Sequence, residues 1–526
     1  MRGVVTRMRT QLHELVADQA AARPDAPALT FKHVTVTYTA LWEQAASFAR
    51  GLQNLGLERG ERVAIYLDKR IETVASVFGT SAAGGVFVPV NPLLRPQQVS
   101  YILADCAVRV LVTSAERYAR LREHLGENTS VEQVIVVDAA PEPDPEPGVA
   151  AWESFVAAGD VPQPGAIDLD IAAIFYTSGS TGKPKGVVLS HRNLLVGGAS
   201  VSQYLENDET DCILAALPLS FDAGFSQLTT GFTAGAHVVL VNYLLPGDVV
   251  RLCAKHRVTG LTCVPPLWIQ LIEQDWPAEA TQSLRYFANT GGRMPKMTLD
   301  RLRAIFPAAK PFLMYGLTEA FRSTYLDPSE VDRRPDSIGK AIPNAEILVV
   351  REDGSPCRPG EEGELVHRGA LVAMGYWNDP ERTAERFRPA PGRDAAVCTT
   401  ETAVWSGDVV VADEEGFLYF VGRRDEMIKT SGYRVSPAEI EEVAYATGLV
   451  GDAVALGVED PRLGQHILLA VSPANGNGLD PDSLLTELRR ELPLYMVPKH
   501  VVVRPALPRS PNGKFDRNLL REELAA

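Results

Sequence analysis

Short runs of apolar, largely β-branched residues recur along the first half of the chain, and segments with the apolar spacing of helices separate them. Such alternation is typical of sheets covered by helices, and it predicts an α/β architecture. The predicted strands are Val63–Tyr66, Val108–Val112, Val134–Val137, Ile171–Tyr176 and His237–Val241.

The pattern restarts after Gly422 with strands and helices of its own. The predicted elements are Val454–Val458, His466–Val471, Ser483–Leu492 and His500–Val503. Roughly 100 residues are enough for a small domain. We therefore expect a large N-terminal domain of helix-covered sheets over residues 1–424 and a small α/β C-terminal domain over 425–526.

Two segments of the N-terminal region need a separate interpretation. Leu12, Leu15, Val16 and Ala20 fall on one face of a helix, and polar residues interrupt the chain around them, so we expect no signal peptide. Prolines at every second position from 141 to 147 exclude a helix or central strand and predict an exposed loop.

Composition narrows the class of protein. The chain has 526 residues, of which 45% are hydrophobic and 22% charged, so disorder is not its dominant state. Its net charge of −15 argues against nucleic acid as the main partner. Six scattered cysteines form no zinc or disulfide pattern. No apolar run approaches the roughly 18 residues of a membrane span, and we expect a cytoplasmic protein without a membrane partner.

The strongest local signal is a loop rich in glycine, serine, threonine and lysine that follows the strand ending at Tyr176. Its sequence is Thr177-Ser-Gly-Ser-Thr-Gly-Lys-Pro-Lys185. Small residues let backbone N–H groups approach a phosphate closely, and the lysines add positive charge. A Walker A loop is excluded because Pro184 follows Lys183. Taken alone, such a loop could also be a polar hairpin turn.

The loop resembles the phosphate loop of the adenylate-forming superfamily, which includes acyl- and aryl-CoA synthetases, peptide-synthetase adenylation domains and luciferases. The resemblance continues in the expected order over the rest of the chain. The further motifs are Tyr315-Gly-Leu-Thr-Glu319, Trp405-Ser-Gly-Asp408, the hinge segment Gly422–Arg434 and Pro511-Asn-Gly-Lys514.

This resemblance implies that the enzyme uses ATP and Mg²⁺. The residues expected to bind ATP are Thr177, Ser178, Gly179, Ser180, Thr181, Gly182, Lys183, Lys185, Gly291, Gly292, Arg293, Tyr315, Gly316, Asp408, Phe420 and Arg423. Those expected to take part in catalysis are Thr318, Glu319, Arg434 and Lys514. The C-terminal domain is expected to rotate about Asp425, and Gly432 would let the backbone pass close to a thioester arm.

Each principal residue suits its implied role. The Tyr315 ring can stack on adenine, Glu319 can ligate Mg²⁺, and Asp408 can accept hydrogen bonds from both ribose hydroxyls. Lys514 would neutralise the charge that develops when a carboxylate attacks the α-phosphorus of ATP. Outside this context the four residues would be a core aromatic, a solvated helix charge, a turn and a surface lysine.

The acid is expected to lie near Leu217–Gln227. Peptide-synthetase adenylation domains place an aspartate after phenylalanine here to pair with the substrate ammonium, and Asp222 occupies that position; the alternative is a helix N-cap. The expected pocket residues are Phe221, Asp222, Ala223, Gly224, Ser226 and Phe321. Ala223 and Gly224 would leave room beside the amine, and Phe321 would close the far end.

The acceptor thiol is expected on a separate protein, since only residues 515–526 follow Lys514. The whole pattern is similar to that of stand-alone enzymes that load β-amino acids onto the phosphopantetheine of acyl or peptidyl carrier proteins in macrolactam polyketide assembly. A fatty or aryl acyl-CoA ligase is the alternative. A catalytically inactive paralogue would have no need of Glu319, Asp408 and Lys514, and a luciferase-like activity gains no support from Asp222.

Overall fold

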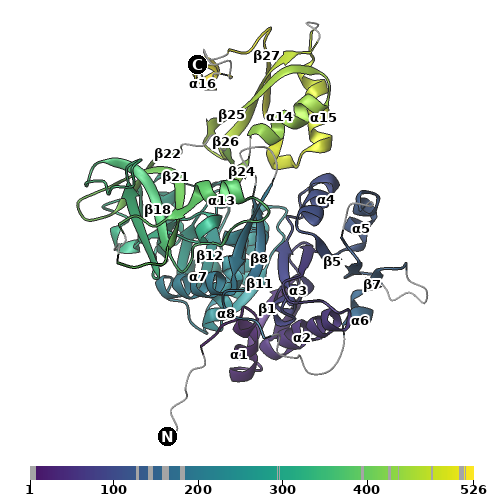
Figure 1. Cartoon of the computed structure of the whole chain (residues 1–526). Helices are drawn as coiled ribbons and strands as arrows, with labels where there is room; N and C mark the ends of the chain where they lie inside the picture. Colours follow the sequence, from purple (N-terminus) through teal and green to yellow (C-terminus); the bar gives the residue numbers. More distant parts are fainter. Residues whose placement is uncertain are drawn as a thin grey trace.

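The fold was analysed in a computed structural model. It describes residues 8–125, 130–139, 146–156, 165–177, 184–292, 294, 296–392, 396–423, 428–435, 437–474, 478–508, 515 and 517–525. Within these ranges the chain forms two large sheets that share a layer of helices, and a third, smaller sheet near the C-terminus (Figure 1).

The first sheet is mixed. From edge to edge its strands are β17 (Ala345–Val350), β18 (Glu362–Gly369), β21 (Thr402–Ala412), β22 (Leu418–Arg423), β16 (Ser337–Ala341), β15 (Thr324–Leu326), β14 (Lys310–Tyr315), β13 (Tyr286–Asn289), β12 (Gly260–Cys263), β10 (Cys212–Ala215), β11 (His237–Leu240), β1 (Pro27–Phe31) and β2 (Val34–Thr37), with β20 (Phe387–Pro389) beside β21. The strands from β14 to β1 are parallel, and those beyond β14 pair antiparallel.

The second sheet is parallel except at one edge. Its order is β19 (Gly375–Tyr376), β9 (Lys185–Ser190), β8 (Ile171–Thr177), β4 (Val86–Pro89), β3 (Arg62–Tyr66), β5 (Val108–Thr113), β6 (Gln133–Val136) and β7 (Val149–Ala151). The antiparallel β8–β9 pair sets Thr177 opposite Lys185, so the two ends of the glycine-rich loop lie side by side.

Helices cover both faces of each large sheet. In chain order they are α1 (Glu14–Ala22), α2 (Tyr38–Asn54), α3 (Ile71–Ala82), α4 (Pro96–Asp105), α5 (Ala115–Leu121), α6 (Trp152–Phe155), α7 (His191–Tyr204), α8 (Asp222–Ala234), α9 (Pro246–His256), α10 (Pro265–Leu271), α11 (Ala278–Ser283), α12 (Lys296–Ile305) and α13 (Pro380–Arg386). The main core joins α2, α3, α7 and α8 to the inner faces of both sheets, while α9, α10 and α12 cover the outer face of the first and α4 and α5 that of the second.

The C-terminal unit has its own core. Its sheet contains β24 (Tyr433–Val435), β23 (Ile428–Thr430), β26 (Gly464–Pro473), β25 (Val450–Asp460) and β27 (His500–Val503). Helices α14 (Pro437–Ala446) and α15 (Pro481–Glu491) pack on one face and α16 (Arg517–Ala525) on the other. It lies at one end of the larger body, where the Arg95 guanidinium donates to the Arg489 carbonyl across the junction at 2.8 Å (Figure 1).

The expected architecture is confirmed. Every predicted strand corresponds to an observed one. Each begins within two residues of the observed strand or lies inside a longer one. Helix α1 begins at Glu14, so Leu12 precedes it, although Leu12, Leu15 and Val16 are all buried. The domain boundary at 424/425 and most of the proline-rich loop, residues 141–145, fall outside the described residues and stay predictions. No helix among the described residues is long and apolar enough to cross a membrane.

Gly339 in β16 offers a test of how tightly the first sheet is built. Its φ is +82°, and a Cβ there would stand 1.8 Å from the Tyr325 carbonyl oxygen on β15. Gly354 has φ +81°, but its Cβ would meet nothing closer than 3.5 Å. Backbone strain of about 1–2 kcal/mol is common to both alanine variants, whereas only Gly339→Ala forces two strands apart.

Gly339→Ala should therefore lower the melting temperature, measured by scanning calorimetry, by at least about 2 °C more than Gly354→Ala. Equal shifts in the two variants would contradict the close approach of β15 and β16.

Candidate active site

A cavity of about 1900 Å³ lies where the strand ends of both large sheets face the C-terminal unit. The larger body contributes Thr177, Asp222, Tyr315 and Asp408 to its lining, and the C-terminal unit contributes Lys429, Gly432 and Tyr433. Residues far apart in the sequence thus share one cavity, whose volume is about twice the upper end of the roughly 300–1,000 Å³ range of a single small-molecule site.

One end of the cavity has the features of a nucleoside site. The Tyr315 hydroxyl, at the end of β14, donates to Asp408 Oδ2 on β21 at 2.5 Å. The Phe420 ring on β22 is tilted against Tyr315, with 6.4 Å between the ring centroids. Tyr315 lines the cavity, so it is not a core aromatic, and Asp408 is buried within a strand, so it is not part of a surface turn.

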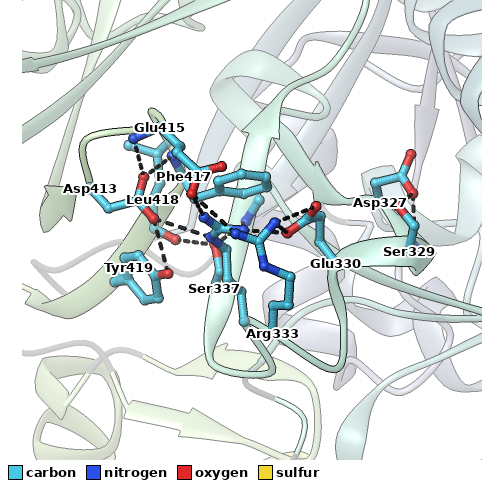
Figure 2. A network of polar contacts seen from close by, with 12 residues as sticks. Asp327, Ser329, Glu330, Arg333, Ser337, Asp413, Glu415, Phe417, Leu418 and Tyr419 are labelled. Carbon is cyan, nitrogen blue, oxygen red and sulfur yellow. Dashed lines mark hydrogen bonds and ion pairs between the residues drawn. The ribbon is translucent and has the colours of Figure 1, made fainter.

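An ion-pair network fixes the wall that carries Phe420. Figure 2 shows the segment around Glu330 facing the turn from Asp413 to Tyr419. Arg334 bridges the two: it binds Glu330 and Glu415 and donates to Asp413 Oδ2 at 3.2 Å. The Tyr419 hydroxyl also donates to Asp413 Oδ2, at 3.2 Å. Tyr419 and Phe420 both line the cavity, so the network holds this wall in place.

A buried cluster surrounds Lys185, the residue at which the glycine-rich loop ends. Lys185 Nζ lies 3.1 Å from Glu319 Oε1 and 2.8 Å from the Tyr376 hydroxyl, which donates to Glu319 Oε1 at 2.6 Å. Burial raises the pKa of Tyr376 above its usual range, so it remains a donor at neutral pH. Glu319 is 2% exposed and is therefore not a solvated helix charge.

The region expected to hold the acid lies at the N-terminus of α8. Asp222 is the first residue of the helix, and the N-cap is Phe221, so the interpretation of Asp222 as N-cap is wrong. The carboxylate is partly exposed to the cavity, and its Oδ2 lies 3.5 Å from Nη1 of Arg322, a residue with 2% exposure.

Three expectations for this pocket need correction. A Cβ on Gly224 would lie 1.9 Å from the Pro218 carbonyl oxygen, so backbone fills the space that we expected to be open. Ser226 is buried in α8, away from the main cavity. Phe321 is fully buried against Gly197 of α7, and Arg322 lines the cavity in its place.

A local turn explains why Arg322, and not Phe321, lines the cavity. Phe321 has φ +56° and ψ −50°, and the Arg322 N–H donates to the Ala320 carbonyl at 2.6 Å. These angles belong to the rarer and more strained type of γ-turn. The turn directs the side chains of Phe321 and Arg322 to opposite sides.

The remaining predicted residues are distributed as follows. Gly291, Gly292, Gly316, Thr318, Phe221 and Ala223 line the cavity. Residues 178–183, Arg293, Asp425 and Lys514 lie outside the described residues, as do the side chains of Arg423 and Arg434. The Thr177 hydroxyl is buried and makes no hydrogen bond to any described residue, so a polar group at the start of the loop is available to a phosphate.

Comparison with known proteins decides the family. Residues 16–377 match the model of the AMP-binding enzymes, and residues 439–514 match that of the AMP-binding enzyme C-terminal domain. The chain belongs to the AMP-binding enzyme family. It is therefore an ATP-dependent, acid-adenylating ligase, as the order of the sequence motifs predicted.

Two curated relatives span different branches of this family. A component of the linear gramicidin synthase of Brevibacillus parabrevis is 32% identical over 97% of the chain, which spans only 6% of that much longer protein. Long-chain-fatty-acid–CoA ligase of Salmonella typhimurium is 30% identical over 97% of the chain and 94% of its own length.

A solved enzyme matches nearly the whole chain in two of its complexes, the first of which is a double mutant. The o-succinylbenzoate CoA synthetase of Bacillus subtilis is 26% identical, and its complex with a CoA product analogue matches with a TM-score of 0.83, covering 97% of this chain and 98% of that one. Its complex with the acyl-adenylate matches at only 0.69, covering 98% and 99%.

Four residues of the ligase site were missed by sequence reasoning: Lys69, Arg322, Tyr376 and Lys429. Arg322 and Lys429 lie within or beside the sequence motifs, and a charged residue within the otherwise uncharged segment 320–326 was a usable signal for Arg322. Lys429 Nζ stands 4.7 Å from the centroid of the Phe420 ring. Lys69 and Tyr376 carry no local signal, because distant segments supply their partners.

Removal of the Tyr376 hydroxyl should impair adenylation. In Tyr376→Phe, Lys185 loses an acceptor and Glu319 a donor, and one hydrogen bond to a charged group corresponds to about a tenfold change in rate. ATP–pyrophosphate exchange should show about that loss in kcat/KM for ATP.

Tyr38→Phe is the matched control, because the buried Tyr38 hydroxyl donates to the Ala236 carbonyl at 2.7 Å, away from the site. The cluster would have no catalytic part if both variants lost activity equally.

Proposed function

We propose that this ligase adenylates an amino acid, specifically a β-amino acid, and transfers the aminoacyl group to the phosphopantetheine thiol of a discrete carrier protein in natural-product biosynthesis. The observation that carries the proposal is the Asp222 carboxylate on the cavity wall, in the segment that resembles the amine-binding motif of peptide synthetases. The β position of the amine rests on the resemblance of the whole chain to macrolactam starter enzymes.

The contact between Asp222 and Arg322 determines how an ammonium could bind. The 3.5 Å separation is longer than a hydrogen bond, so the two groups attract each other without a direct hydrogen bond. An ammonium that hydrogen-bonds the carboxylate directly would gain the stronger, charge-assisted interaction. It must nevertheless compete with Arg322.

The same ion pair also favours a second candidate function, a fatty or aryl acyl-CoA ligase. If Arg322 neutralises Asp222 permanently, the end of the pocket carries no net charge and suits an apolar acid. The full-length similarity to a long-chain-fatty-acid–CoA ligase supports this alternative.

The catalytic roles that we propose rest on the sequence motifs and, for Lys185 and Glu319, on their contact in the fold. We propose that Lys514 stabilises the developing charge during adenylation. Glu319 would contribute one carboxylate to Mg²⁺, whose other ligands would be phosphate oxygens and water, and Lys185 would then bind phosphate in place of Glu319. No group of three His, Cys, Asp or Glu among the described residues could hold a metal ion.

We further propose that the present arrangement of domains serves thiol transfer. The better match to the CoA-product complex than to the acyl-adenylate complex of one enzyme supports this. Gly432 lines the cavity with φ +81°, and a Cβ there would lie 3.0 Å from the Val264 side chain. A side chain at this position would thus narrow the space through which a thioester arm could enter.

Asp222→Asn tests the choice of acid. Loss of a buried charge partner costs about 3 kcal/mol, so kcat/KM for the amino acid should fall about 100-fold, while the matched deamino acid is nearly unaffected. ATP–pyrophosphate exchange with matched pairs of α-amino, β-amino and unsubstituted acids measures this. Equal losses on both members of a pair would mean that Asp222 only balances Arg322, and the acyl-CoA ligase assignment would replace ours.

Transfer assays test the acceptor. A carrier protein bearing phosphopantetheine should be acylated with a higher kcat/KM than free CoA, measured by mass spectrometry of the carrier and chromatography of CoA thioesters. The carrier lacking its phosphopantetheine is the control and should accept nothing. Acylation of CoA with an efficiency equal to that of every carrier tested would overturn this part of the proposal.

A further inference from the structure

Lys69 occupies an unusual position between the two large sheets. It follows β3 of the second sheet and precedes α3, is 7% exposed and lies in the cavity lining. Its Nζ donates to three consecutive backbone carbonyls, those of Ala215 at 2.9 Å, Ala216 at 2.8 Å and Leu217 at 3.1 Å. Three acceptors around one nitrogen match the three hydrogens of a charged ammonium.

The backbone of Lys69 is itself held in place. Asn242, just after β11 of the first sheet, accepts from the Lys69 N–H at 3.2 Å and donates to the Lys69 carbonyl at 2.8 Å. The Asn242 side chain therefore fixes the backbone of Lys69, while the Lys69 ammonium binds the end of β10. Both partners come from the first sheet. This double attachment clamps the end of β3 to the ends of β10 and β11.

The three carbonyls belong to the loop that leads to Asp222. The Gln227 side chain accepts from the Leu217 N–H at 3.1 Å and donates to the Leu214 carbonyl at 2.9 Å. On the far side of the loop, Gly224 permits the close approach of the Pro218 carbonyl to α8. The path of the loop from β10 to Asp222 thus depends on Lys69 and Gln227, and only Lys69 can change its charge.

We propose that Lys69 is a positioning residue for the acid pocket, and that loss of its proton weakens binding of the acid without weakening binding of ATP. The proposal rests on the placement of the acid beside residues 217–223 under the proposed function. It does not depend on whether the acid carries an amine.

The charge of Lys69 can change near neutral pH. Burial lowers its pKa to about 7, against smaller opposing effects of Cys263 on β12 and of the neighbouring Asp68. Above that pH the amine keeps two hydrogens, and its lone pair faces one of the three carbonyl oxygens. One hydrogen bond of the clamp is then lost, and the loop before Asp222 is held less firmly.

Stability and acid binding should respond to pH in opposite directions. Because the folded-state pKa lies below the ordinary lysine value, the unfolded chain binds this proton more tightly between about pH 7 and about pH 10. The contribution of Lys69 to the free energy of unfolding therefore rises with pH in this window, while the KM for the acid also rises. A purely structural lysine would show only the first effect.

The test is ATP–pyrophosphate exchange between pH 6 and pH 9 on the full-length enzyme, with whichever acid the wild type activates best. For the wild type, the KM for the acid should rise about tenfold above pH 7 while the KM for ATP stays level. Lys69→Met should have a KM for the acid at least about tenfold higher at pH 6, and it should lack the rise that the wild type shows. Subtracting the pH profile of Lys69→Met from that of the wild type removes any change in the KM that comes from titration of the acid itself.

Asn242→Ala is the second variant, because it releases the backbone of Lys69 and leaves the ammonium in place. It should raise the KM for the acid and retain the pH dependence, and it keeps the test decisive if Lys69→Met does not fold. A rise with pH that persists in Lys69→Met, or an equal rise in the KM for ATP, would overturn the proposal. Failure of the amino-acid assignment would appear separately, as a preference of the wild type for deamino acids.

Discussion

The single layer of helices between the two large sheets constrains the rest of the structure. Helices α3, α7 and α8 must bury apolar surface toward both sheets. Neighbouring helices approach each other closely where one of them carries a glycine. A Cβ on Gly198 of α7 would lie 3.1 Å from the Thr229 carbonyl oxygen of α8, and one on Gly79 of α3 would lie 2.5 Å from the Ala45 carbonyl oxygen of α2. This close packing fixes how the two sheets face each other, and so brings their strand ends to one cavity.

The chemistry of the cavity depends on charges that the fold has removed from water. Lys185 and Glu319, Arg322 and Asp222, and Lys69 with its three carbonyls are all buried or nearly so. A buried charge is tolerated when a partner and hydrogen bonds compensate for its lost hydration. Under the proposed function a substrate group would take over part of that compensation for two of them, phosphate for Lys185 and an ammonium for Asp222, whereas Lys69 would keep its carbonyls. Under that proposal, Lys185 and Asp222 would exchange a protein partner for a substrate group, and Lys69 would hold the backbone beside them.

The elements of the fold could be predicted well because they are local. The strand Val108–Val112 and the strand His500–Val503 were visible as short runs of β-branched residues, a pattern that can be read along the chain without knowledge of its partners. Bounds were less certain, as Leu12 shows by lying ahead of its helix. Phe321 was expected in the pocket because it lies just past the second ATP motif, but the γ-turn at that residue places its side chain in the core and Arg322 at the cavity.

The sequence by itself determined the α/β class, the succession of strands, the order of the ATP-binding motifs and hence the family. These properties are carried by spacing along the chain, which a single sequence displays. Only the tertiary structure decided which charges meet: Lys185 with Tyr376, Asp222 with Arg322, and Lys69 with the carbonyls of Ala215 to Leu217. The physical reason is that the partner of a buried charge is chosen by the packing of segments far apart in the sequence, 191 residues for Lys185 and Tyr376 and 146 for Lys69 and Ala215, and no local pattern records that choice.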